Sequence, residues 1–325
     1  MALSGLSVGE KVGGSVMGAR VNFETFSAFV FELYERSQVE DAMTLLKWSV
    51  EALGDTVGCD SNWGGWADLS RDEICVCASV SRNLPDDYYR FWTAIKHEDL
   101  LARDVISTGC EVASYNRQGS RHTDGMVALS DRYNIDKLSV IVVDFKSSPT
   151  PLFLSSYRSG RHAKAFGAEE LQYLRAALGH VRLAVERDAL GKRGGHDLLV
   201  DDDGRVLAAS PDALKVLPQL WPGWKGDRLP QPLGSRAQAK GRFERFEAPR
   251  FCGPPVFYLR VNDPCGNLTL REHEIVDHIA NGLTYKEIAR ELGISPATVR
   301  NHTQAVLTKL GARNKAALIK LVHAG

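Results

Sequence analysis

The 325-residue sequence lacks any apolar run long enough to cross a membrane, and residues 1–20 contain no apolar segment of the kind found in signal peptides. Its six cysteines form no C-x-x-C pair, and its nine histidines show no H-E-x-x-H spacing. A phosphate loop and a nucleophile elbow are also missing. We therefore expect a cytoplasmic protein with reduced thiols that is not an enzyme, is not bound to a membrane, and holds no metal and no cofactor.

Acidic residues are missing from the C-terminal end of the chain. The chain as a whole has 40 basic and 40 acidic residues, but residues 292–325 contain five Lys or Arg and no Asp or Glu. Basic residues supply most of the non-specific affinity of proteins for duplex DNA, because they neutralise phosphates. The upstream residues 1–267 are slightly acidic, with 32 basic residues against 35 acidic ones. By bulk charge, a DNA-binding surface is therefore expected only at the C-terminal end.

The segment 267–325 predicts four short helices. Two of them begin with a capping box, in which a threonine is followed three residues later by a glutamate: Thr269 with Glu272, and Thr284 with Glu287. A third helix begins at Ser295, and a fourth runs over about 314–322.

The third helix presents two different faces. Its inner stripe consists of Val299, Val306 and Leu310, and His302 near that stripe is expected to pack rather than to read bases. Polar side chains point outward near the N-terminal end, which is the end that leads into a major groove. These outward residues are Thr298, Arg300, Asn301 and Gln304. The alternative is a small helical domain with an ordinary solvated basic face.

The segments 268–275, 280–289, 294–302 and 309–311 closely resemble the LuxR-type helix-turn-helix domain. The resemblance implies a four-helix DNA-binding domain that dimerises through its last helix, with RNA polymerase as a further partner of the regulator. It also implies that Arg300, Asn301 and Gln304 face the major groove, and that Lys286, Thr298 and Lys309 contact phosphate. The full set of expected DNA-binding residues is Thr284, Lys286, Thr298, Arg300, Asn301, Gln304 and Lys309. Residues 314–317 depart from the family pattern, which leaves the dimer contacts less defined.

Upstream, the pattern predicts a flexible segment over 1–20 and then a domain over 21–190. Two amphipathic helices come first, and the segment 59–66 is turn-like. Further expected elements are a strand at 73–78, helices at 86–107 and 125–133, strands at 138–145 and 152–157, and a closing helix at 168–190. This order suits a mixed sheet covered by helices, and it resembles a GAF-like or PAS-like sensing domain.

The closing helix carries Leu171, Leu174, Leu178, Val181 and Val185 at coiled-coil spacing. This stripe either packs on its own domain or forms a homodimer seam. After a linker at 191–195, a hairpin, a helix and two strands over 196–261 resemble a reduced PAS-like module, and 262–267 links it onward.

Aromatic residues with two polar partners mark the best candidates for a ligand pocket. These are Trp63, Trp66, Tyr88, Tyr89, Trp92, His97 and Asp99. The part from Tyr88 to Asp99 resembles the aromatic-plus-Asp pocket of acyl-homoserine-lactone receptors, although this chain is longer and has an extra module. The alternative for each aromatic residue is a place in the core. Cys75 and Cys77 could be metal or redox ligands, but small buried residues are the simpler interpretation.

The sequence thus predicts an α+β protein with a mixed-sheet GAF/PAS-like region, a small PAS-like module and an all-α four-helix LuxR-type domain. The expected function is that of a homodimeric regulator of transcription that binds double-stranded DNA under the control of a small-molecule effector. Two alternatives are a response-regulator-like or partner-controlled transcription factor without a ligand, and an enzyme that also binds DNA. A phosphorylated receiver would need a parallel βα repeat with an acidic cluster, which the sequence does not show.

Overall fold

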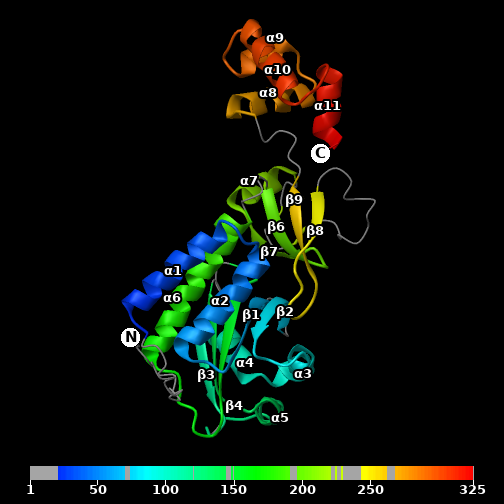
Figure 1. The fold of residues 1–325 in the computed structure, drawn as a ribbon. Coiled ribbons are helices and arrows are strands. Elements are labelled where there is room, and N and C mark those ends of the chain that lie inside the picture. The colour runs from blue at the N-terminus through cyan, green and yellow to red at the C-terminus, as the bar shows by residue number, and fades with distance from the viewer. Residues whose placement is uncertain are drawn as a thin grey trace, which may run out of the picture.

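The chain folds into two antiparallel sheets with helices around them, followed by a group of four helices (Figure 1). The computed structural model describes residues 21–69, 74–119, 121–143, 148, 150–190, 196–220, 224, 228, 229, 243–261 and 268–324. The expected flexible segment 1–20 and the expected linkers 191–195 and 262–267 lie outside this part. The α+β fold class is confirmed.

The first sheet has the strand order β2-β1-β5-β4-β3, and every pairing in it is antiparallel. The mixed sheet that we expected is therefore antiparallel throughout. Its strands are β1 (Ser61–Asp68), β2 (Cys75–Arg82), β3 (Val112–Asn116), β4 (Ile135–Val143) and β5 (Leu152–Ser159). The pattern of the sequence missed β3 altogether.

Strand β1 corrects the expectation of a turn at 59–66. Gly64 and Gly65 suggested a turn, but they lie in the middle of the sheet. A Cβ atom on Gly65 would overlap the carbonyl oxygen of Ala78 on β2. The glycine is therefore needed because two strands approach closely, and not because the chain reverses.

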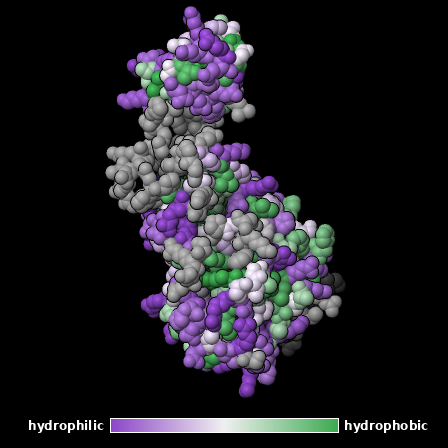
Figure 2. All heavy atoms as spheres, turned by 180° about the vertical axis from the view of Figure 1, so that it is seen from behind, coloured by the Kyte–Doolittle hydropathy of each residue, from purple (hydrophilic) through white to green (hydrophobic). Residues whose placement is uncertain are grey.

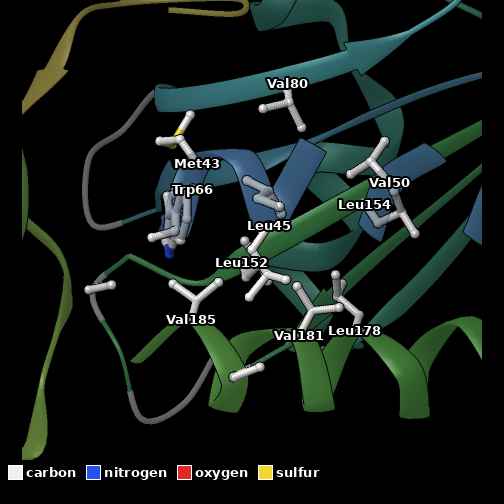
Figure 3. Close-up of a cluster of buried hydrophobic side chains, with 14 of the residues drawn as sticks. Met43, Leu45, Val50, Trp66, Val80, Leu152, Leu154, Leu178, Val181 and Val185 are labelled. Carbon is white, nitrogen blue, oxygen red and sulfur yellow. The ribbon is translucent and has the colours of Figure 1, made fainter. Parts of the chain in front are cut away.

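One face of the first sheet is covered by α1 (Phe23–Ser37), α2 (Ala42–Val57) and α6 (Ala168–Ala184). In Figure 3, Leu178, Val181 and Val185 point toward Leu152 and Leu154 of β5. Four residues of the predicted seam, all but Leu171, are buried in this core. Most of the apolar stripe on the closing helix therefore packs within its own chain. After α6 the helix continues as one π-helical turn, η2 (Val185–Ala189).

The other face of this sheet carries α3 (Tyr88–Ile95), η1 (Lys96–Glu98), α4 (Leu100–Thr108) and α5 (Asp124–Tyr133). The single helix expected over 86–107 is thus broken. The break falls at Asp99, whose backbone is extended and whose Oδ1 accepts a hydrogen bond from Ala102 N at 3.1 Å. An aspartate in this conformation caps a new helix rather than continuing the old one.

The second sheet has the order β7-β6-β9-β8, again antiparallel. It consists of β6 (His196–Asp201), β7 (Val206–Ala209), β8 (Phe243–Glu247) and β9 (Val256–Val261), with α7 (Pro211–Leu220) packed on one face. Residues of the opposite face, among them Leu199 and Tyr258, belong to the same core as α1, α2 and α6. Tyr258 Oη also donates a hydrogen bond to Asp41 Oδ1 at 2.6 Å and accepts one from Met43 N at 3.0 Å. The two sheets therefore share one helical layer.

The last four helices are α8 (Leu270–Ala280), α9 (Tyr285–Glu291), α10 (Pro296–Lys309) and α11 (Lys315–Ala324). Both predicted capping boxes are present, and Ser295 caps α10 by accepting a hydrogen bond from Thr298 N at 3.0 Å. The buried residues of these helices form a core of their own, which includes Ile275, Ile288 and Val306. Within the described ranges, no helix combines the length and the apolar character needed to span a bilayer.

Candidate DNA-binding surface and ligand cavity

The N-terminal half of α10 presents polar side chains to solvent. Val299, Thr303 and Val306 are buried against the neighbouring helices. Arg300, Asn301 and Gln304 are exposed, as the helical spacing predicts, and His302 is half-buried. Figure 2 shows that this helical group, seen from behind, has a mostly hydrophilic surface.

The basic side chains around α10 fall into two groups. Lys286 and Arg300 are exposed, and neither forms a side-chain hydrogen bond or ion pair within the part of the chain that the structure describes. Lys315, by contrast, donates a hydrogen bond to the carbonyl oxygen of Leu283 at 2.8 Å, and its Nζ lies 5.3 Å from the centroid of the Tyr285 ring. The first group is available to a partner, whereas Lys315 helps to hold α11 on the other helices.

Lys309 belongs to the second group. Its Nζ lies 2.6 Å from Glu272 Oε2, the carboxylate that also closes the capping box of α8. The hydrogen bond from Lys309 and the backbone N–H of Thr269 lower the pKa of Glu272 to about 2. In the unbound protein, Lys309 therefore joins the end of α10 to the start of α8.

The two threonines among the expected DNA-binding residues lie at helix N-termini: Thr284 is the cap residue of α9, and Thr298 is in the first turn of α10, next to the cap residue Ser295. Thr284 Oγ1 donates a hydrogen bond to Glu287 Oε2 at 2.7 Å, and Thr298 Oγ1 lies 2.8 Å from Ser295 Oγ. Both hydroxyls therefore stand at the N-terminal ends of their helices, α9 and α10, where the helix dipole and free N–H groups attract phosphate oxygens.

A second feature is a cavity of about 60 Å³ between the first sheet and helices α3, α4 and α5. Four of the seven predicted ligand residues line it: Trp63, Tyr88, Trp92 and Asp99. The remaining lining residues are mainly aliphatic or aromatic, and include Leu101, Val105, Leu138, Val142, Phe153, Ser155 and Tyr157. Among the described residues, those that line the cavity include no Lys, Arg or His.

The other three predicted residues lie elsewhere. Trp66 is three positions from Trp63 on β1, so it faces the opposite side of the sheet, where it is buried in the core with α2 (Figure 3). His97 is exposed, with its Nε2 3.6 Å from Glu98 Oε1. Tyr89 is half-buried and lines a separate groove with Phe251 and Cys252.

Strand β5 supplies cavity residues that the sequence analysis missed. Phe153, Ser155 and Tyr157 alternate along the strand and so point to the same side. The signal was present in this period of two, but the sequence does not reveal which face of the strand meets α3.

Two hydrogen-bonded pairs of polar side chains form part of the cavity wall. Tyr88 Oη and Tyr157 Oη are 2.7 Å apart, and Trp92 Nε1 donates a hydrogen bond to Asp99 Oδ2 at 2.9 Å. Burial raises the pKa of Asp99, and burial raises the pKa values of Tyr88 and Tyr157 well above their ordinary range. The tyrosines are therefore neutral hydrogen-bonding groups. In the described residues no group of three His, Cys, Asp or Glu side chains could hold a metal ion, and Cys77 is a small buried residue of the core.

Comparisons with known proteins concern mainly the C-terminal helices. The family model described as bacterial regulatory proteins, luxR family, matches residues 266–322. The transcriptional regulatory protein UhpA of Salmonella typhimurium is 47% identical over 56 residues, which are 17% of this chain and 27% of UhpA. The chain therefore spans only about a quarter of the length of that relative.

The spore germination protein GerE of Bacillus subtilis is 42% identical over 59 residues, which are 18% of this chain but 80% of GerE. Among solved structures, Escherichia coli SdiA aligns over 92% of this chain and 97% of its own, with 16% sequence identity and a TM-score of 0.37.

Proposed function

The chain belongs to the luxR family of bacterial regulatory proteins, and from this premise we propose that it is a transcriptional regulator that binds double-stranded DNA under the control of a small molecule. The single observation that carries the DNA-binding part is the polar, exposed N-terminal face of α10, where Arg300, Asn301 and Gln304 stand together beside a capped helix end. A helix that presents such residues at its leading end fits a major groove.

Roles can be proposed for each expected DNA-binding residue. Arg300, Asn301 and Gln304 would read base edges, because their amide and guanidinium groups match the donors and acceptors of the major groove. Lys286, Thr284 and Thr298 would contact phosphates near the N-terminal ends of α9 and α10. Lys309 would reach a phosphate only by leaving Glu272. Its contribution to affinity is therefore the gain of an ion pair with phosphate minus the loss of the ion pair with Glu272.

Control by a small molecule is proposed from the cavity behind α3, α4 and α5. It combines apolar walls with a few polar groups, which is the usual composition of a ligand site. The main alternative among regulators, a phosphorylated receiver, requires parallel strands, and every strand pairing in the described upstream region is antiparallel. Control by a protein partner alone leaves this cavity without a role.

The proposed organisation has a sensing domain over 21–190, a small module over 196–261 and the DNA-binding domain over 267–325. We propose that two chains act together on one DNA site, with α11 and the helix over 168–190 as the candidate contact surfaces. Most of the apolar stripe of the second surface is buried within the chain, which favours α11. A dimer would bind half-sites about one helical turn apart or closer, and would present RNA polymerase with a regulator bound in a fixed orientation.

The DNA-binding proposal is tested by selecting duplexes from a random pool with the full-length protein. We expect a roughly palindromic site to be enriched, and the affinity for it to fall steeply as salt concentration rises, because phosphate contacts release counterions. Recovery of no sequence preference at any salt concentration would contradict the proposal.

The ligand proposal is tested by thermal unfolding with a panel of metabolites and signalling lipids, after native mass spectrometry for a co-purified compound. A ligand at 100 times its dissociation constant adds about 2.7 kcal/mol to the stability of the folded state. A hit should also change the affinity for the selected duplex. If no compound is bound and none shifts the transition, control by a partner becomes the better proposal.

A further inference from the structure

A groove of about 350 Å³ lies where α3 of the first sheet meets the connection between β8 and β9 of the second sheet. Two arginines from these separate parts of the chain line it, Arg90 within α3 and Arg250 in the connection. We propose that this groove binds a small organic monocarboxylate with a flat apolar part, and that Arg90 and Arg250 hold the carboxylate. The site is separate from the cavity behind α3, α4 and α5, and its ligand is additional to the proposed function.

The connection that forms one side of the groove is fixed to β2 (Figure 1). Cys252 N donates a hydrogen bond to the carbonyl oxygen of Ser79 at 3.1 Å, and Ser79 Oγ donates one to the carbonyl oxygen of Cys252 at 3.1 Å. Gly253 has a φ of +85°, and a Cβ atom on it would lie 3.0 Å from Ser79 Oγ and 3.7 Å from Tyr89 Cε2. The connection therefore rests on both β2 and α3. Both sides of the groove are held in place before any ligand arrives, which lowers the cost of binding.

The two arginines favour an anion. Both are exposed, and neither forms a side-chain hydrogen bond or ion pair within the described ranges. A guanidinium group keeps its charge at physiological pH and can donate two parallel N–H bonds to one carboxylate. Burial raises the pKa of Tyr89 and the pKa of Cys252, so the phenol and the thiol in the groove are neutral. Neither group therefore competes for the arginines as an anion.

Asp86 limits the charge of the ligand. It lines the same groove and, in the part of the chain that the structure describes, its side chain has no hydrogen-bond or ion-pair partner. One negative charge on a ligand complements the two arginines beside one aspartate. A phosphate monoester carries nearly two negative charges at pH 7, and the second charge would face Asp86. A single carboxylate therefore suits the groove better.

The remaining lining favours a flat apolar group on the ligand. Tyr89 and Phe251 contribute rings, and the Phe251 side chain is 42% exposed. The lining also includes three prolines, which are Pro85, Pro249 and Pro254. A planar group packed against these rings would remove Phe251 from water. The volume of the groove is within the range of small-molecule sites, so a carboxylate that carries one ring fits it.

Helix α3 separates this groove from the cavity. Tyr88 lines the cavity, whereas the next residue, Tyr89, lines the groove. A ligand in the groove would contact α3 on one side and the connection between β8 and β9 on the other. It would therefore hold the two sheets together from outside, independently of any molecule in the cavity.

The test uses two probes of nearly the same shape, 3-phenylpropionate and its neutral amide. Binding to the full-length protein is followed by NMR of methionine methyl groups labelled with ¹³C. Met43 lines the groove, whereas Met126 belongs to the core around the cavity, so the two methyl groups report which site is occupied. Affinities are measured for wild type, Arg90→Gln, Arg250→Gln and Arg161→Gln. Arg161 is the matched control, because it is exposed and does not line the groove.

In wild type, we expect the carboxylate to shift the Met43 resonance, to leave the Met126 resonance unmoved, and to bind more tightly than the amide. The ratio of carboxylate affinity to amide affinity should fall about threefold to tenfold in Arg90→Gln and in Arg250→Gln, and stay unchanged in Arg161→Gln. Asp86→Asn should raise the ratio about twofold, because a like charge is removed. The carboxylate should also bind more weakly as salt concentration rises.

The comparison of the two probes on wild type needs no variant, so misfolding cannot obscure it. Equal affinity of carboxylate and amide, or no binding of the carboxylate, would overturn the proposal. A shift of Met126 without a shift of Met43 would place the probe in the cavity and overturn the site. Phenyl phosphate that binds more tightly than 3-phenylpropionate would overturn the single charge. The duplex selection and the ligand panel described above do not depend on the groove, so the proposed function is decided separately.

Discussion

Arg205, which immediately precedes β7 of the second sheet, and Asp68, the last residue of β1, form an ion pair that is almost completely removed from solvent. Asp68 is fully buried, and the Arg205 side chain is 11% exposed. The pair joins the two sheets at a point where the neighbouring residues, Ala67 and Leu69, line the cavity. A displacement of the cavity wall would therefore be transmitted to the second sheet through this ion pair.

Replacing Arg205 with Met should destabilise the protein by about 3–5 kcal/mol, because Asp68 would stay buried without its cation. The double change Asp68→Leu with Arg205→Met should recover much of this loss, since the fully buried Asp68 carboxylate is then absent. Asp201, whose Oδ2 lies 3.9 Å from Arg205 Nε, still loses that partner in both variants. Lys215→Met is the control, because it breaks an exposed pair with Asp212 and should cost at most about 1 kcal/mol. Urea unfolding would measure the free energy of unfolding of every variant. Equal decreases for Arg205→Met and Lys215→Met would contradict the importance of the buried pair.

Two helical glycines should respond in opposite directions to the same change. A Cβ atom on Gly54 of α2 would overlap Asn62 Oδ1 and lie 3.2 Å from Arg82 Cδ, whereas one on Gly179 of α6 would meet nothing within 4 Å. Gly54→Ala should therefore lower stability by about 1–3 kcal/mol through overpacking. Gly179→Ala should raise it by about 0.5–1 kcal/mol, because alanine favours the helix. Thermal and urea unfolding would measure both, and a stabilising Gly54→Ala would be the unexpected result.

Removing the Lys309 ammonium should change the acid stability of the C-terminal helices. The folded-state pKa of Glu272 is depressed to about 2, mainly by Lys309. The interaction therefore stabilises the fold fully above the ordinary glutamate pKa of about 4.5, and that contribution is lost as the pH falls toward 2. In Lys309→Gln, the pKa of Glu272 should move back upward, as followed by NMR of labelled glutamate carboxyls. Lys320→Gln serves as the control on an exposed lysine, and an unmoved Glu272 in Lys309→Gln would mean that the capping box alone sets this pKa.

Substitutions on α9 and α10 should separate base contacts from phosphate contacts. Arg300→Ala or Asn301→Ala should relax sequence preference at one or two positions, at a cost of about 1–3 kcal/mol for the preferred duplex. Lys286→Ala should weaken binding to all duplexes similarly. It should also reduce by about one the slope of the logarithm of the binding constant against the logarithm of the salt concentration. Binding to the selected site and to scrambled duplexes over a salt series would measure both effects. The same loss of preference from all three variants would show that the roles are assigned wrongly.

The C-terminal helices could be predicted almost completely from the sequence, because their signals are local. A capping box joins residues three apart, and the inner stripe of α10 repeats within one helix. The engagement of Lys309 could not be predicted in this way. Its partner Glu272 is 37 residues away, and only the packing of α8 on α10 brings the two together.

The cavity could be predicted only in part for a related reason. The composition of the segment around Tyr88 and Trp92 identified cavity residues. Composition does not show, however, which face of the sheet each residue of a strand occupies. Trp63 and Trp66 look equivalent in the sequence, and only the register of β1 in the sheet sends one to the cavity and the other to the core. The break at Asp99 was likewise hidden, since an aspartate within an aromatic stretch can continue a helix or cap the next one.

The shared helical layer has a practical consequence for engineering. Leu199 and Tyr258 of the second sheet are buried in the same core as α1, α2 and α6. A truncation at residue 190 would remove the second sheet and expose apolar residues of these helices to solvent. A chimera that uses the part of this protein upstream of α8 should therefore be cut after β9, at residue 261, so that both sheets are included. A chimera that contains the first sheet without the second should aggregate through the exposed apolar faces of these helices.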